Sequence, residues 1–279
     1  MISCKGVHKA FGGKTVLDEI NLNVSRGEIF GLLGPSGAGK TSLIKILTGQ
    51  LAGDGGQVSI LGKEPLALTG EDHRGMGIMM DQFGVYERFS CMDNLKIFAD
   101  IYGISYHQAE KALCDVGLKE EKKTVAAKLS KGMRSRLCLA RVFMTEPQIM
   151  FLDEPTSGLD PATTASIHEL ILKKRAEGCT IFLTTHNMDE AAKLCDYVAL
   201  LNEGRIVEYG NPTEICRKYD HQRSIRIHLY DGREEVLDYS DTTADKIQAL
   251  IKTGKLQTIH STEPNLESVF MELTGRRID

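Results

Sequence analysis

Residues 34–42 read GPSGAGKTS, a glycine-rich stretch that ends in a lysine and two hydroxyl residues. Its spacing, G-x-x-x-x-G-K-[ST], is that of a Walker A phosphate-binding loop, which needs a strand before it and a helix after it. The apolar run IFGLL (29–33) and the helical pattern TSLIKILTG supply both. Backbone N–H groups of such a loop surround phosphate oxygens, and the helix N-terminus adds the positive end of its dipole. The chain is therefore expected to bind a nucleoside triphosphate.

Two residues of this loop carry the most specific chemistry. Lys40 can reach the β- and γ-phosphates, and the Thr41 hydroxyl can ligate Mg²⁺. The nucleotide-binding residues predicted for the loop are Gly34, Pro35, Ser36, Gly37, Ala38, Gly39, Lys40, Thr41 and Ser42.

A pair of carboxylates follows a second apolar run, in IMFLDEP (149–155). Ligands of parallel sheets bind at the carboxyl ends of the strands, where this pair would lie. Asp153 suits the Mg²⁺ shell, usually through water, and Glu154 suits a general base that polarises the attacking water. The alternative is a solvated pair of acids at a strand end, which the companion phosphate loop makes the minority interpretation.

Composition restricts the class of protein. The 279 residues are 42% hydrophobic and 26% charged, as in an ordinary globular protein, and the net charge is −4 without a basic block. Sequence-independent nucleic-acid binding is therefore not expected. No segment resembles a signal peptide or a membrane span, so the chain is expected to be cytosolic. The cysteines are scattered and indicate reduced thiols: 4, 91, 114, 138, 179, 195 and 216.

Short apolar runs alternate with helical patterns along most of the chain, which predicts an α/β fold with a mostly parallel sheet. A helix is expected from Leu95 to Tyr102 with Gly103 as its stop. Another begins with Asp160 and Pro161 and ends before Gly178. The predicted strands are 19–24, 29–33, 77–80, 149–152, 180–184 and 197–201.

The secondary-structure pattern of the sequence changes twice along the chain. Residues from about 85 to 135 are nearly all helical in pattern and lie between two strands, so they are predicted to form an inserted helical subdomain. After about 217 a hairpin (SIRIHL, a DG turn, EEVL) precedes a helix around 243–252 and a last helix with Leu266, Val269, Phe270 and Leu273 on one face. We therefore predict a nucleotide-binding domain over 1–216 and a small α/β appendage over 217–279.

The stretch KLSKGM distinguishes among phosphate-loop proteins. LSKGM (129–133) resembles LSGGQ, the signature of ATP-binding cassette (ABC) ATPases, and it lies just upstream of the carboxylate pair, as in that family. Other family motifs follow in order: Gln82 resembles the Q-loop, SGLD (157–160) the D-loop and His186 the switch histidine. Phe11 resembles the aromatic residue that stacks on adenine. The resemblance covers about residues 1–215.

This resemblance implies a RecA-like, mostly parallel core with an antiparallel β subdomain, and ATP and Mg²⁺ as cofactors. It also implies head-to-tail pairing, in which Ser130 and the N–H groups around Gly132 bind the γ-phosphate of the partner's ATP. The implied catalytic residues are Glu154, His186 and Gln82, and the implied metal-binding residues are Thr41, Gln82 and Asp153. The implied nucleotide contacts beyond the phosphate loop are Phe11, Ser130 and Gly132.

Lys131, Met133 and Phe11 depart from the family motifs, and alternatives stay open for Lys131 and His186. Lys131 and Met133 replace a glycine and a glutamine of LSGGQ, and Lys131 either adds charge near the nucleotide or faces solvent, which we favour. Phe11 replaces the more usual tyrosine and keeps the stacking face. His186 is either a strand-end histidine bonded to a carbonyl or, as its place after the Glu154 strand favours, a γ-phosphate contact.

The chain lacks a membrane span and has the helical insertion. In both respects it resembles the ATPase subunits of transporters whose permease is a separate chain. Phe83, Val85, Tyr86 and Phe89 are either docking residues for that permease or internal packing. LSKGM, SGLDP and the tail EPNLESVFMELTG are most similar to bacterial ABC-2-type exporter ATPases. The resemblance thus implies a homodimer that is peripheral on the inner face of the cell membrane through its permease.

Three alternatives are weighed against the exporter subunit. An importer ATPase shares every nucleotide motif. A soluble ABC ATPase of DNA repair or translation would normally carry a coiled coil, a second cassette or a basic surface. A regulatory module without turnover is disfavoured because Glu154 and His186 are both present.

Overall fold

The computed structural model describes residues 1–80, 84–220, 224–261 and 263–275. Its chain divides into two compact units that meet between Gly210 and Asn211. The division precedes α8 (Pro212–Lys218) instead of following residue 216, because α8 contacts α10 (Leu266–Thr274) of the second unit.

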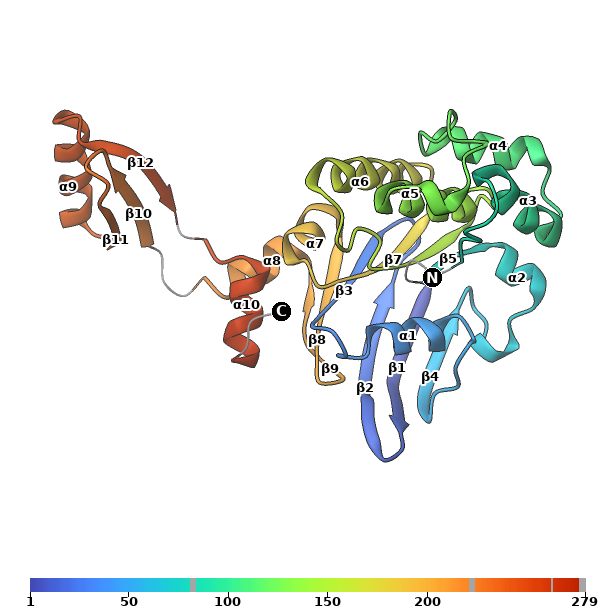
Figure 1. Ribbon diagram of the computed structural model, residues 1–279. Helices are drawn as coiled ribbons and strands as arrows, with labels where there is room; N and C mark the ends of the chain where they lie inside the picture. Colours follow the sequence, from blue (N-terminus) through green and yellow to red (C-terminus); the bar gives the residue numbers. More distant parts are fainter. Residues whose placement is uncertain (81–83, 221–223, 262, 276–279) are drawn as a thin grey trace. The chain divides into compact units, whose positions relative to one another are not determined.

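The first unit is built on a six-stranded sheet (Figure 1). In order across the sheet its strands are β5 (Met76–Met80), β6 (Ile149–Asp153), β7 (Thr180–Thr185), β3 (Ile29–Leu33), β8 (Tyr197–Asn202) and β9 (Arg205–Gly210). Only the β8–β9 pair is antiparallel among these described strands. Every residue of β3, β6 and β7 is buried, which confirms that their apolar runs are covered on both faces.

A stack of aromatic rings fixes the register of the three central strands. Phe30 of β3 pairs with Phe182 of β7, which pairs with Phe151 of β6. The ring centroids are 5.2 Å and 5.7 Å apart, and all three side chains are fully buried. A slip of one residue would turn these rings to the opposite face, so the stack selects one register.

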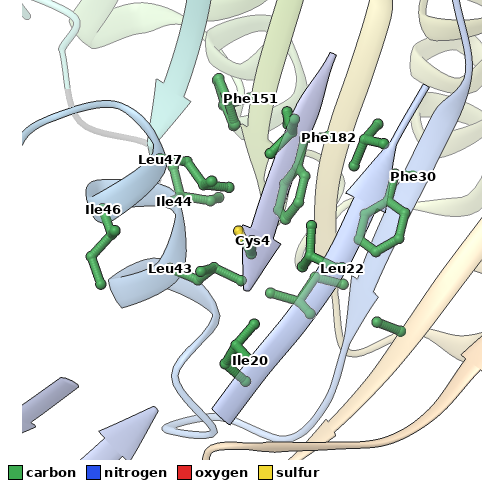
Figure 2. Packing of buried hydrophobic residues seen from close by; sticks show 14 of the residues in the cluster. Cys4, Ile20, Leu22, Phe30, Leu43, Ile44, Ile46, Leu47, Phe151 and Phe182 are labelled. Carbon is green, nitrogen blue, oxygen red and sulfur yellow. The ribbon is translucent and has the colours of Figure 1, made fainter. Parts of the chain in front are cut away.

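A second sheet, antiparallel, contains β2 (Lys14–Val24), β1 (Ile2–Phe11) and β4 (Gly55–Ile60) in that order. Helix α1 (Lys40–Leu47) packs in the core shared by the two sheets, and Figure 2 shows Leu43 and Ile44 of α1 beside Cys4 of β1. The strand expected at 19–24 is the second half of β2. Because α1 follows the phosphate loop directly, this core holds the loop in place.

Three helices flank the central strands in sequence: α5 (Lys131–Phe143) precedes β6, α6 (Pro161–Ala176) follows β6, and α7 (Met188–Leu194) follows β7. Helix α5 contacts β5, and α7 contacts β3 and β7. The start predicted for α6 is confirmed, since the Asp160 side chain accepts a hydrogen bond from the Thr163 N–H and Pro161 is the first helical residue.

The helical insertion contains α3 (Cys91–Tyr102) and α4 (Tyr106–Asp115), which contact each other and α5. Gly103 ends α3 with φ of 68°, as its place in the pattern predicts. The expectation of a nearly all-helical insertion is wrong for 116–130, where turns surround a 3₁₀ helix (Ala126–Lys128). Here LKEEKK offers no apolar stripe for a helix to bury. Two further short helices lie earlier, η1 (Pro65–Ala67) and α2 (Gly70–Arg74).

The second unit has its own sheet, in the order β11 (Glu234–Asp238), β10 (Ser224–Leu229) and β12 (Leu256–Ser261), with α9 (Asp241–Lys252). The expected β10–β11 hairpin is confirmed, with Gly232 in the turn at φ of 86°. Strand β12 was not anticipated, because LQTIHS is mostly polar and its residues are largely exposed. In α10, Leu266, Val269 and Phe270 are buried, as the helical pattern predicts.

All seven cysteines lie among the described residues, and none of them forms a disulfide. Burial raises the pKa of the Cys4 and Cys179 thiols to about 12, so both stay protonated at neutral pH. Within the described part of the chain, no helix has the length and apolar character needed to cross a membrane.

Candidate functional site

The glycine-rich loop joins β3 to α1 and depends on glycine at two crowded points. Gly39 precedes α1 with φ of 114°, and a β-carbon there would lie 2.7 Å from the Val16 carbonyl oxygen. A β-carbon on Gly34 would lie 2.2 Å from the Leu201 carbonyl oxygen. Besides exposing backbone N–H groups, these glycines therefore let the loop lie against β2 and β8.

Lys40 is the buried cation of the loop, with 6% of its surface exposed. Its ammonium donates hydrogen bonds to the carbonyls of Gly34 at 2.7 Å and Pro35 at 3.3 Å. The same ammonium lies 3.2 Å from Oε1 of Glu154. The lysine predicted to bind phosphate thus forms an ion pair with the predicted base.

Asp153, at the end of β6, is 5% exposed and is satisfied by hydroxyl groups. Thr41 donates to its Oδ2 at 2.8 Å, and Thr184 of β7 donates to its Oδ1. The structure therefore brings together Thr41 and Asp153, the two metal-binding residues predicted within the described chain.

Glu154 adopts a left-handed backbone with φ of 52°, a conformation that costs a non-glycine residue about 1–3 kcal/mol. Its N–H donates to the Thr184 carbonyl at 3.1 Å, which holds this turn against β7. The turn directs the carboxylate between two groups, since Oε2 lies 2.6 Å from Nδ1 of His186 and Oε1 faces Lys40. His186 thus contacts a carboxylate in place of a backbone carbonyl.

These groups line an open pocket of about 690 Å³. Five lining residues were not anticipated from the sequence as nucleotide contacts: Val16, Lys45, Gln50, Met80 and Ser157. Only Ser157 carried a signal, because it opens the SGLD motif. The pocket is lined by Val16, Ser36, Gly37, Gly39, Lys40, Thr41, Ser42, Lys45, Gln50, Met80, Asp153, Glu154, Ser157 and His186.

Other predicted contacts lie elsewhere. Among the described residues that line this pocket, Phe11, Ser130 and Gly132 do not occur. Phe11 is 48% exposed, with the Lys9 ammonium 5.1 Å from its ring centroid. Gln82, predicted as catalytic and metal-binding, lies outside the described residues, as does Phe83.

The signature forms the start of α5. Ser130 is its N-cap and accepts a hydrogen bond from the Met133 N–H at 3.2 Å. Lys131 is exposed, as favoured, yet its ammonium lies against the D-loop, where a β-carbon on Gly158 would be 2.4 Å from it. Gly132 is buried against α6, and a β-carbon there would be 2.6 Å from Cγ2 of Thr163.

The aromatic residues of the helical insertion pack against one another and stay partly exposed. Tyr86 lies 5.7 Å from Phe89 and 6.4 Å from Phe98 between ring centroids, so these rings pack on α3. Tyr86 and Phe89 are nevertheless 50% and 44% exposed. They form an internal cluster that keeps one face toward solvent.

Comparisons with known proteins identify the family. The ABC transporter family matches residues 17–157. A fluoroquinolones export ATP-binding protein of Mycobacterium tuberculosis is 39% identical over 267 residues, covering 93% of this chain and 87% of that protein. The chain belongs to the ABC transporter family. These matches confirm the family resemblance seen in its motifs. As an ABC ATPase the chain binds and hydrolyses ATP.

Further relatives extend the similarity over the whole ABC ATPase chain. A Nod factor export ATP-binding protein of Bradyrhizobium is 33% identical over 300 residues, covering 100% of this chain and 97% of that protein. A solved ATP-binding subunit of an ABC transporter is 28% identical, with a TM-score of 0.70 over 78% of this chain and 93% of that one. The predicted α/β P-loop NTPase fold is thereby confirmed.

The close approach of Gly132 to Thr163 gives a test of whether a side chain fits at position 132. Gly132→Ala should destabilise the protein by about 1–3 kcal/mol, because overpacking outweighs the gain of about 1 kcal/mol that alanine brings to a helix. Thr163→Ser removes the methyl group and keeps the hydroxyl, so the double variant should recover most of the loss. Urea unfolding of the three variants measures this. A Gly132→Ala protein as stable as wild type would show that α5 moves freely away from α6.

Proposed function

We propose that this chain is the ATP-binding subunit of an ABC exporter and that it drives a separate membrane permease by ATP binding and hydrolysis. The observation that carries the catalytic part is the position of the Glu154 carboxylate, 3.2 Å from the Lys40 ammonium and 2.6 Å from Nδ1 of His186. One carboxylate thus lies between a phosphate-binding cation and an imidazole at the mouth of the phosphate loop.

In the proposed reaction the phosphates of ATP lie along the loop from Ser36 to Ser42, at the N-terminus of α1. Lys40 exchanges its carbonyl partners for the β- and γ-phosphate oxygens. Glu154 accepts a hydrogen bond from the attacking water and takes its proton, while His186 contacts the γ-phosphate. Phe11 presents an exposed ring for adenine. Gln82 keeps the role that the family resemblance gives it.

The residues fit a magnesium ion bound together with the substrate phosphates. Thr41 and Asp153 present oxygen atoms, the ligands that Mg²⁺ prefers, within 2.8 Å of each other. No group of three acidic, histidine or cysteine side chains suited to a metal occurs in the described chain. Bound in this way, the ion would neutralise charge on the β- and γ-phosphates.

A head-to-tail homodimer is part of the proposal. Ser130 and Gly132 lie outside the pocket that contains Lys40, and that pocket is open to solvent. A second copy of the chain would bring its Ser130 hydroxyl and the N-terminus of its α5 to the γ-phosphate. ATP would then be bound by both copies, and hydrolysis would release them.

Export through a separate permease is supported by the named roles of the relatives. Those of Mycobacterium tuberculosis and Bradyrhizobium are both export ATP-binding proteins. The half-exposed rings of Tyr86 and Phe89 are the proposed contact with the permease. The proposed location is therefore the cytoplasmic face of the membrane.

Replacing the proposed base tests the assignment of Glu154. Glu154→Gln should lower the rate of ATP hydrolysis by about 10²–10⁴-fold and should accumulate an ATP-bound dimer. Turnover and size-exclusion elution with ATP measure the two effects. Glu146→Gln is a matched control, because Glu146 also has a left-handed backbone (φ of 45°) but lies outside the pocket. Wild-type turnover by Glu154→Gln would exclude this residue as the base.

The head-to-tail arrangement predicts complementation between two inactive variants. Lys40→Ala removes the phosphate-binding cation, and Ser130→Glu places a carboxylate where we propose that the γ-phosphate binds. A mixed dimer has one site in which both residues are intact, so mixing the two proteins should restore ATP hydrolysis. If activity stays absent after mixing while each variant still dimerises with wild type, the sites are not shared between copies.

The transporter assignment predicts a membrane partner. The tagged chain, isolated from detergent-solubilised membranes of its native cell, should carry a stoichiometric protein with several membrane spans. Tyr86→Ser with Phe89→Ser should reduce the amount of that partner. Recovery only from the soluble fraction would contradict a transporter subunit and favour a soluble ABC ATPase.

A further inference from the structure

Glu190 of α7 is a buried carboxylate that the proposed catalytic roles do not use. It is 3% exposed and accepts three hydrogen bonds from side chains. Thr156 donates to Oε1 at 2.5 Å, and Thr185 donates to Oε2 at 2.6 Å. The Nε2 atom of His168 lies 2.9 Å from Oε1. Every one of these groups is held inside the first unit.

The three partners come from three different segments. Thr156 lies between Glu154 and the SGLD motif, in the turn that follows β6. Thr185 is the last residue of β7 and immediately precedes His186. His168 belongs to α6, the helix that follows SGLD. The Glu190 side chain thus joins the segment that follows Glu154 to the strand end that precedes His186. Glu154 and His186 themselves meet at 2.6 Å.

The loop that carries His186 is anchored further through the same network. The Asn187 N–H donates to Oγ1 of Thr185 at 3.0 Å, and the Glu190 N–H donates to Oδ1 of Asn187 at 3.0 Å. Thr185 is 2% exposed, so its hydroxyl has no competing contact with water. The hydroxyl of Thr185 therefore fixes the backbone on both sides of His186.

We propose that Glu190 is a positioning residue for ATP hydrolysis: it holds the Glu154 turn and the His186 loop at the separation at which their side chains meet. This inference rests on the proposed roles of Glu154 and His186. A carboxylate is suited to the task because its two oxygens accept several hydrogen bonds at once, and all the side-chain groups that contact it can donate.

The structure also indicates why an apolar residue would not substitute. Thr156, Thr185 and His168 would lose their acceptor, and buried polar groups without partners are costly. They would turn toward other acceptors, and the two turns would separate. A displacement of about 1 Å between reacting groups lowers a rate by as much as a hundredfold.

Two variants test the positioning role with little change in shape. Glu190→Gln keeps the size of the side chain but replaces one acceptor oxygen with a donor, and Thr185→Val removes one hydroxyl. Each should lower kcat by about tenfold to a hundredfold while leaving KM for ATP near wild type, because the phosphate loop is outside the network. The double variant should lose less than the product of the two single losses.

Thr180→Val is the matched control. Thr180 is fully buried at the other end of β7, and its hydroxyl accepts one hydrogen bond, from the Gly27 N–H at 2.9 Å. It should lower the unfolding midpoint in urea about as much as Thr185→Val but keep kcat. Equal losses of kcat in Thr180→Val and Thr185→Val would overturn the proposal, because the effect would then be one of stability. Wild-type kcat in Glu190→Gln and Thr185→Val would overturn it as well.

Glu154→Gln, measured in the same assay on the full chain, distinguishes failure of the positioning role of Glu190 from failure of the base role of Glu154. If Glu154→Gln loses hydrolysis and the Glu190 and Thr185 variants do not, only the positioning role fails. If Glu154→Gln hydrolyses ATP normally, the proposed base itself is wrong.

Discussion

The parallel pairing of β3, β7 and β6 is the constraint on which the site depends. Leu33 pairs with Thr185, and Asp153 pairs with Thr184, so the three strands end at neighbouring positions on one edge of the sheet. The phosphate loop, the Glu154 turn and the His186 loop therefore begin side by side. Because Phe30, Phe182 and Phe151 stack across the same strands, the packing of the core also sets the spacing of the proposed catalytic groups.

The buried acids of this edge are satisfied mainly by neutral hydroxyls. Asp153 accepts hydrogen bonds from Thr41 and Thr184, and Glu190 accepts them from Thr156 and Thr185. Hydroxyl donors compensate a carboxylate for the loss of water without cancelling its charge. Asp153 can then still attract a metal ion, whereas pairing with a lysine would have neutralised it. The buried lysine of the phosphate loop, Lys40, faces Glu154 instead.

The sequence predicted the central strands and the residues of the phosphate loop because both depend on local pattern. IFGLL and TIFLT are short, wholly or mostly apolar runs typical of buried strands. GPSGAGKTS matches a phosphate-binding loop at every defined position. It missed β12 because the six residues of that strand are mostly polar and exposed at a sheet edge, so no alternation marks them. It also missed Val16, Gln50 and the network of Glu190. These contacts join residues far apart in sequence, and nothing in the local pattern records which of them meet.

Helix α5 shows how the two halves of the proposed dimer site are joined within one chain. Its first turn contains no acidic residue, so Lys131 and the helix dipole leave this end electropositive and suited to an anion. One turn further on, the Ser135 hydroxyl donates to the Pro155 carbonyl at 2.9 Å, directly after Glu154. An anion that displaces the start of α5 must therefore strain this hydrogen bond or move the Glu154 turn with it. In the proposed dimer, binding at the signature of one chain would thus be linked to hydrolysis in its own pocket through Ser135 and Pro155. A ligand would shift that equilibrium only as far as it binds one position of α5 more tightly than the other.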